Sequence, residues 1–199
     1  RGAYGWARPA EAADFDDLAD VEEYFRRSGA LLCLTHLLGA EDLHMHNVVA
    51  TRRGPVLIDG EGLFQPELDG EIARAYGLAR AGSEDSCLGS GLLSLLERDA
   101  NGALRDVGGL RGEGGFQVPG GARRWQGVGT DALHYREVPD VLPAAANRPR
   151  LNGKPRRPEQ HAAALRRGFE ETYRFVERHR EELHATEGPG ADRLNSLAI

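Results

Sequence analysis

The first sustained pattern of apolar positions lies between Asp20 and Gly39. Apolar residues recur there at roughly helical spacing, at Val21, Tyr24, Phe25, Leu31, Leu32, Cys33 and Leu38. Asp20 and Glu23 have the spacing of a capping box at a helix start, and Gly39 is a residue type at which helices commonly end. The pattern therefore predicts a helix from Asp20 to Gly39, although Gly29 lowers the helix propensity of its middle.

Two short β-branched runs follow this helix. They occupy residues 48–51 and 56–58, and the four residues between them, Arg-Arg-Gly-Pro at 52–55, have a composition typical of a turn. The pattern predicts a β-hairpin.

Helical spacing returns in three later segments. Residues 67–80 and 84–98 suit helices, although Gly89 and Gly91 interrupt the second. Residues 159–184 have the clearest pattern, with an apolar stripe made of Leu165, Phe169, Tyr173 and Val176. The helices and the hairpin together predict an α+β fold that is mainly helical.

The remaining segments have few apolar positions. Residues 101–129 contain ten glycines, which favours loops with short strands near residues 116–118. Residues 139–158 are rich in Pro, Arg and Asn and are expected to form an extended surface segment. Residues 185–199 are expected to form a weakly structured tail.

Composition limits the class of protein. A chain of 199 residues with 40% hydrophobic and 28% charged residues suits one folded domain, or most of one. The net charge of −6 argues against a general nucleic-acid binder. The longest apolar run, residues 30–34, is too short to span a membrane. Cys33 and Cys87 are too few for a disulfide framework, so we expect both in the core of a cytoplasmic protein.

The hairpin brings residues with candidate chemistry together. Asn47 precedes its first strand and Asp59 follows its second, so the two should lie close in space. Their oxygens are hard ligands that suit Mg²⁺ with a bound phosphate, as in ATP. Asp42 lies five residues before Asn47, which is the spacing between the catalytic base and the metal-binding Asn of kinases. We predict that Asp42 is the base and that Asn47 and Asp59 bind the metal and the nucleotide.

His44 and Glu61 extend this candidate site. His44 lies on the same loop as Asp42 and could donate to a phosphate oxygen or move a proton. Glu61 lies two residues past Asp59, where it could be a second carboxylate near the metal or a general acid or base. The simpler alternative is that such acids are solvated turn residues. His46 is interpreted as a surface or packing residue.

The glycine-rich sequence RGEGGFQVPGG, residues 111–121, invites comparison with a phosphate-binding loop. It lacks the Lys-Ser/Thr ending and does not lie between a clear strand and a helix start. We therefore assign it no phosphate-binding role.

Several motifs resemble the N-terminal dehydratase domain of class II lanthipeptide synthetases, the LanM-type enzymes. They begin with YGWA at 4–7, the segment VEEYFRRSGALLCLTHLLGAEDLHMHN and the element IDGEGLFQP. Later and weaker similarities are WQGVGTDAL at 125–133, NRPRLNG at 147–153 and RRGFEETY at 166–173. Gly60 departs from the family pattern, which usually has a large apolar residue there. The resemblance covers most of the chain.

This resemblance implies the C-lobe of a protein- or lipid-kinase-like domain. It implies ATP- and Mg²⁺-dependent phosphorylation of Ser and Thr in a ribosomally made precursor peptide, followed by elimination of phosphate to dehydroalanine or dehydrobutyrine. Asp42, His44, Asn47, Asp59 and Glu61 match the family's active-site positions. We expect residues 1–199 to be a partial dehydratase domain, without the N-lobe or the carboxy-terminal cyclase, and to be inactive alone.

Two alternatives remain open. An aminoglycoside- or choline-kinase-like phosphotransferase also has D-L-H-x-x-N followed by I-D-x-E, but usually places a His two residues before the catalytic Asp, where this chain has Ala40. The second alternative is a degenerate domain that only binds a peptide.

Overall fold

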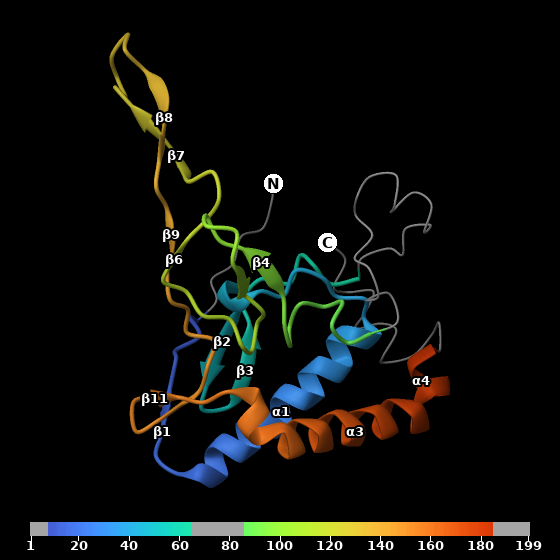
Figure 1. Cartoon of the computed structure of the whole chain (residues 1–199). Coiled ribbons are helices and arrows are strands. Elements are labelled where there is room, and N and C mark those ends of the chain that lie inside the picture. The colour runs from blue at the N-terminus through green and yellow to red at the C-terminus, as the bar shows by residue number, and fades with distance from the viewer. Residues whose placement is uncertain (1–7, 65–85, 185–199) are drawn as a thin grey trace.

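The computed structural model describes residues 8–64 and 86–184 (Figure 1). The helices are α1 (Leu18–Leu37), α3 (Ala162–Arg178) and α4 (Arg180–His184), with short 3₁₀ turns at Met45–Asn47 and Pro158–His161. The early strands are β1 (Asp14–Phe15), β2 (Val48–Thr51), β3 (Gly54–Leu57), β4 (Leu96–Arg98) and β5 (Leu104–Asp106). The later strands are β6 (Phe116–Gln117), β7 (Ala122–Gln126), β8 (His134–Val138), β9 (Val141–Leu142), β10 (Arg150–Leu151) and β11 (Lys154–Pro155).

The crossing of α1 and α3 organises the lower part of the molecule (Figure 1). Gly29 and Gly168 are both buried where the helices meet. A Cβ on Gly29 would clash with the backbone carbonyl of Leu165, and one on Gly168 with that of Arg26. The glycine that weakens the helix propensity of α1 is therefore the residue that lets the two backbones touch.

The start of α1 differs from the sequence prediction. The N-cap is Asp17, whose Oδ1 accepts a hydrogen bond from the backbone N–H of Asp20 at 2.8 Å. Asp20 as N-cap was therefore wrong by three residues. Glu23 does not close a capping box, because its carboxylate pairs with Arg26 and Arg27. The predicted end is confirmed: α1 stops at Leu37, and Gly39 has a left-handed φ of 57°.

The predicted hairpin is present. Strands β2 and β3 pair antiparallel from Val48 opposite Leu57 to Thr51 opposite Gly54. The turn is shorter than expected, because Gly54 and Pro55 belong to β3 and only Arg52 and Arg53 connect the strands. The first three residues of β2 are buried, so this strand is part of the core.

The helix predicted over residues 84–98 is wrong for its described part. Residues 86–95 form turns and β4 occupies Leu96–Arg98. Gly91 has a φ of 74°, which interrupts any helix there. The carbonyl of Ser90 accepts instead from the backbone N–H of Leu43, a contact that no local pattern could predict.

The glycine-rich part of the chain contains more strand than expected. Strand β6 confirms the strand predicted near residues 116–118, and it pairs with β9. Strands β7 and β8 form a long hairpin that projects from the body of the molecule (Figure 1). Trp125 and Tyr135 stack across it with ring centroids 3.5 Å apart, and both are about half exposed.

The core has two apolar clusters. One joins α1 to β2 and α3 through Phe15, Val21, Tyr24, Phe25, Ala50, Leu151 and Ala164. The other contains Leu32, Ala40, Leu43, Val48, Leu92 and Leu110. Cys33 is buried as predicted, which raises the pKa of its thiol, and Cys87 packs partly buried against the second cluster.

The helix predicted over residues 159–184 is confirmed for α3, but it starts in a 3₁₀ turn and is interrupted at His179, after which α4 begins. Leu165 and Phe169 pack against the core, Tyr173 is 49% exposed and Val176 is partly buried, so the predicted stripe is covered unevenly by the described residues. The helix predicted over 67–80 and the tail at 185–199 lie outside the described residues. Within the described part, no helix is long and apolar enough to cross a membrane.

Substitution Gly168→Ala should destabilise the protein. Alanine improves helix propensity, but its Cβ cannot coexist with the Arg26 carbonyl unless the helices separate. We expect a loss of about 1–3 kcal/mol in the free energy of unfolding, measured by urea denaturation. Ala163→Ser, at an exposed position of α3, is the control and should change stability little. A stabilised Gly168→Ala variant would contradict the close crossing.

Glu23 should make stability depend on acid pH. Hydrogen bonds from Arg26 and Arg27 lower the pKa of this carboxyl from 4.5 to about 2. A lowered folded-state pKa contributes stability that is present above pH 4.5 and is lost as the pH falls towards 2. The difference in unfolding free energy between wild type and Glu23→Gln should be constant near neutrality and shrink through this window. If this difference in unfolding free energy were equal at pH 7 and pH 3, the lowered pKa of Glu23 would be contradicted.

Candidate active site

The loop that contains Asp42, residues 38–47, is held by its own backbone. Asp42 has a left-handed φ of 59°, which is uncommon for a residue with a side chain. Its carbonyl accepts hydrogen bonds from the backbone N–H of His44 at 2.9 Å and from Nδ2 of Asn47 at 3.0 Å. The second bond ties together the predicted base and the predicted metal ligand five residues later.

The same bond fixes the chemistry of the Asn47 amide. Because Nδ2 donates to the Asp42 carbonyl, the remaining polar atom of the side chain is Oδ1. An amide oxygen is a hard ligand of the type that Mg²⁺ prefers.

The strand ends of the hairpin lie against this loop. The backbone N–H of Ile58 donates to the carbonyl of Asn47 at 3.0 Å, which places Asp59, the next residue, beside the end of the loop. Glu41 N–H donates to the Gly62 carbonyl at 2.8 Å, so the segment after the hairpin also runs along the loop. The two halves of the predicted site are therefore brought to the same end of the hairpin.

The turn after β3 is compact. Oδ1 of Asp59 accepts from the backbone N–H of Glu61 at 3.4 Å, as in an Asx turn. A Cβ at Gly62 would clash with the Glu41 carbonyl, whereas a Cβ at Gly60 would lie 3.4 Å from Leu63 Cδ1. Only a glycine at position 62 therefore allows this close approach, while position 60 has room for a side chain.

Two buried residues anchor the loop from behind. The backbone N–H of Leu43 donates to Ser90 at 2.9 Å, and that of Met45 to Val107 at 2.7 Å. Both apolar side chains are fully buried. Burial alternates from residue 42 to residue 45, so that Asp42 is exposed and His44 is partly exposed between the buried Leu43 and Met45. This alternation of buried and exposed side chains was not predicted, although the sequence indicates it by placing Leu43 and Met45 between polar residues.

The two histidines of the loop differ in their surroundings. Nδ1 of His44 accepts from the backbone N–H of His46 at 3.2 Å, so a neutral His44 has its proton on Nε2. His46 Nε2 is buried and has no hydrogen-bond partner among the described residues. Burial, and next the charge of nearby His44, lower the pKa of His46. This agrees with the interpretation of His46 as a packing residue.

The donor set fits a metal that is completed by its substrate. Asp59 and Asn47 offer a carboxylate and an amide oxygen, which suits Mg²⁺ bound through one or two protein groups plus phosphates. In residues 8–64 and 86–184, no group of three or more His, Cys, Asp or Glu side chains is arranged to hold a metal ion by itself. The assignment of Asn47 and Asp59 as metal ligands therefore stays a prediction.

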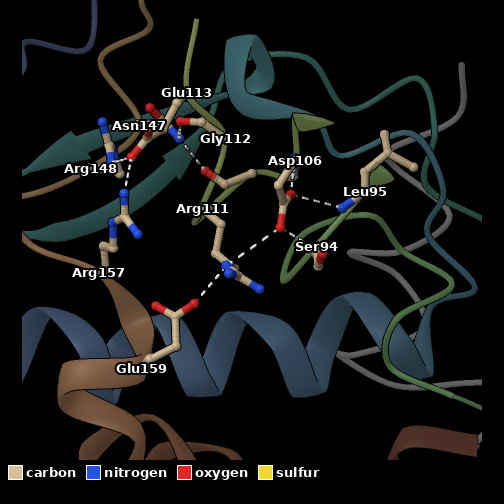
Figure 2. A network of polar contacts seen from close by, with 12 residues as sticks. Ser94, Leu95, Asp106, Arg111, Gly112, Glu113, Asn147, Arg148, Arg157 and Glu159 are labelled. Atoms are coloured by element: carbon tan, nitrogen blue, oxygen red, sulfur yellow. Dashed lines mark hydrogen bonds and ion pairs between the residues drawn. The ribbon is translucent and has the colours of Figure 1, made fainter. Parts of the chain in front are cut away.

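Asn147 supports the site from a distance and was also missed. The prediction that residues 139–158 form a surface segment is wrong at Asn147, which is buried. Its Nδ2 donates to the carbonyl of Gly112 (Figure 2) and to that of Gly109. The backbone carbonyl of Asn147 accepts from the hydroxyl of Tyr24. The two bonds donated by this buried amide fix the segment that contains Gly109 and Gly112.

Comparison with known proteins identifies the family. A family model described as "Domain of unknown function (DUF4135)" matches residues 1–198, so the chain belongs to this family. A protein similar to part of the chain is "Lacticin 481/lactococcin biosynthesis protein LcnDR2" from Lactococcus lactis subsp. lactis, which is 31% identical over 61 residues. The matched segment covers 31% of this chain and 7% of that protein. No solved structure gives a significant match.

Gly60 and Gly62 allow a matched test of the contact between the turn after β3 and the Asp42 loop. Gly62→Ala should lower the free energy of unfolding by about 1–3 kcal/mol, because the new Cβ meets the Glu41 carbonyl. Gly60→Ala, two residues away in the same turn, should be tolerated. Thermal unfolding followed by circular dichroism measures both. Equal effects of the two substitutions would contradict the contact between Gly62 and the Asp42 loop.

Proposed function

We propose that the chain is part of the dehydratase region of a lanthipeptide synthetase, with the kinase-like C-lobe of that region as its fold. In this proposal the whole protein is cytoplasmic, uses ATP and Mg²⁺ to phosphorylate Ser and Thr of a precursor peptide, and then eliminates the phosphate. The family membership and the partial match to a lacticin 481 biosynthesis protein support a relation to lanthipeptide synthetases.

One observation carries the proposal. The Asn47 side chain donates to the Asp42 carbonyl, while the Asn47 carbonyl accepts from Ile58, next to Asp59. Asn47, itself one predicted metal ligand, thus links the predicted base to the segment of the other ligand, Asp59. A phosphotransferase needs these groups around one phosphate, because its catalysis depends on positioning and on charge neutralisation.

Each residue then has a role that its contacts allow. Asp42, exposed on a constrained loop, accepts the proton of the substrate hydroxyl. His44 can donate from Nε2 to a phosphate oxygen, because its Nδ1 is held by His46 N–H. Asn47 and Asp59 hold Mg²⁺, which when bound neutralises phosphate charge. Glu61, beside Asp59, is a further acid or base for the elimination.

Mass spectrometry of the cognate precursor peptide tests the proposal. After coexpression with the whole protein, the peptide should lose one water for each modified Ser or Thr. Asp42→Asn should abolish this loss, because removal of a catalytic base typically lowers the rate by about 10²–10⁴-fold. Asp16→Asn, an exposed aspartate between β1 and α1, is the matched control and should leave modification intact.

The alternatives predict other results. A small-molecule phosphotransferase would leave the peptide unmodified and would phosphorylate an aminoglycoside or choline in the presence of labelled ATP. A degenerate peptide-binding domain would do neither, and it would show no Mg²⁺-dependent nucleotide binding.

A further inference from the structure

A hollow separate from the candidate active site lies between β5, β6 and the 3₁₀ turn before α3. Its volume is about 300 Å³, and its walls include Arg105, Arg111 and Arg157 together with Asp106 and Glu113. Figure 2 shows part of this wall, with Arg111 reaching both Asp106 and Glu159. The size is at the lower end of that found for small-ligand sites.

The acceptor capacity of Asp106 is already used by the protein. Its Oδ1 accepts from the backbone N–H groups of Leu95 and Gly108, and its Oδ2 accepts from the Ser94 hydroxyl and pairs with Arg111. A carboxylate offers about four acceptor positions, and all four are occupied here. Asp106 therefore holds the wall together and has no acceptor position left for a ligand, and Arg111 balances part of its charge.

The negative charge of Glu113 is balanced by two arginines. Its Oε1 accepts from both Arg148 and Arg157 (Figure 2). Burial would raise the pKa of this carboxyl, but the two arginines outweigh that effect and lower it. Glu113 therefore stays ionised as the partner of two cations.

The arginines, by contrast, keep unused donors. A guanidinium group has five N–H donors. Within the described part of the chain, Arg111 makes its ion pairs through Nε, and Arg157 uses only one terminal nitrogen. Arg105 pairs through Nε with buried Asp99 and lies over the ring of Phe116 at 5.7 Å. The hollow thus has a surplus of hydrogen-bond donors, although the whole chain has a net charge of −6.

We propose that this hollow binds a carboxylate side chain of the peptide substrate, and that it therefore selects an acidic segment. Guanidinium groups recognise carboxylates and phosphates through charge-assisted, often paired hydrogen bonds. The inference rests on the proposed function for the identity of the ligand as a peptide. Free phosphate has the same chemistry and should compete for the same donors.

The hollow is connected to the candidate site by a short segment. Asp106 ends β5, and the next residues, Val107 and Gly108, pair with Met45 and His44 of the Asp42 loop. A peptide held at the arginines would therefore be anchored on the element that backs the loop.

A binding measurement with the whole protein and without ATP tests the proposal. The probe is a fluorescein-labelled hexaglutamate peptide, followed by fluorescence anisotropy, and its hexaglutamine counterpart is the uncharged comparison. We expect binding of the first at least about tenfold tighter than that of the second, and displacement by inorganic phosphate.

Variants locate the site. Arg157→Gln should weaken hexaglutamate binding about tenfold, because it removes guanidinium donors from the hollow. Arg157→Lys should restore part of it. Arg166→Gln is the matched control, because Arg166 is also exposed and paired with one glutamate, at 3.1 Å on α3. Equal binding of the two peptides, or equal weakening by Arg157→Gln and Arg166→Gln, would overturn the proposal.

The test is independent of catalysis. Asp42→Asn should bind hexaglutamate as the wild type does, even if it modifies no peptide. A protein that dehydrates its precursor but does not distinguish the two probes would retain the proposed function and lose this inference. Circular dichroism of each variant separates loss of binding from loss of folding.

Discussion

The arrangement of the molecule depends on how the Asp42 loop is held between two other segments. On one side, Leu43 and Met45 are buried and bonded to Ser90 and Val107. On the other side, backbone hydrogen bonds from Glu41 and Ile58 join the loop to the end of the β2–β3 hairpin. The polar residues between these anchors have little freedom, so Asp42 can keep a left-handed backbone conformation. A left-handed backbone in a residue with a side chain is strained, and it persists only where surrounding contacts hold it in place. Strain of this kind is common at functional sites.

The parts of the site that could be predicted are local in sequence. Asp42 and Asn47 are five residues apart, and a hairpin joins its own ends, so their proximity to Asp59 followed from spacing alone. The predictions that were wrong concern residues whose contacts are distant in sequence. Residues 86–95 have helical spacing, but Ser90 accepts a backbone hydrogen bond from the Asp42 loop, and the carbonyls of Gly91, Leu92 and Leu95 accept from residues 107–110. Asn147 looks like a surface residue until its amide meets Gly109 and Gly112, which lie 38 and 35 residues away.

Glycine makes two close backbone contacts possible. Gly29 looked like a weakness of α1, yet it is the contact point with α3, and Gly62 is its counterpart beside the loop. In both cases a backbone carbonyl from another segment occupies the space of a Cβ. A sequence pattern shows that glycine lowers the stability of a helix or turn. The close backbone contact that glycine permits depends on a segment that is distant in sequence.

One segment, Asp106–Gly108, supports both the Asp42 loop and the hollow that the arginines line. This segment is fixed by the complete set of hydrogen bonds around Asp106 and, further along, by Asn147. A rigid support of this kind suits a protein that has to hold a flexible substrate near a reactive group.

We propose that the loop and the hairpin hold Asn47 and Asp59 as one metal and nucleotide site. Calorimetric titration of the whole protein with ATP, with and without Mg²⁺, tests it most directly. We expect ATP binding that depends on Mg²⁺ in the wild type and a loss of this dependence in Asp59→Asn. Nucleotide binding of equal strength with and without Mg²⁺ in both proteins would contradict it.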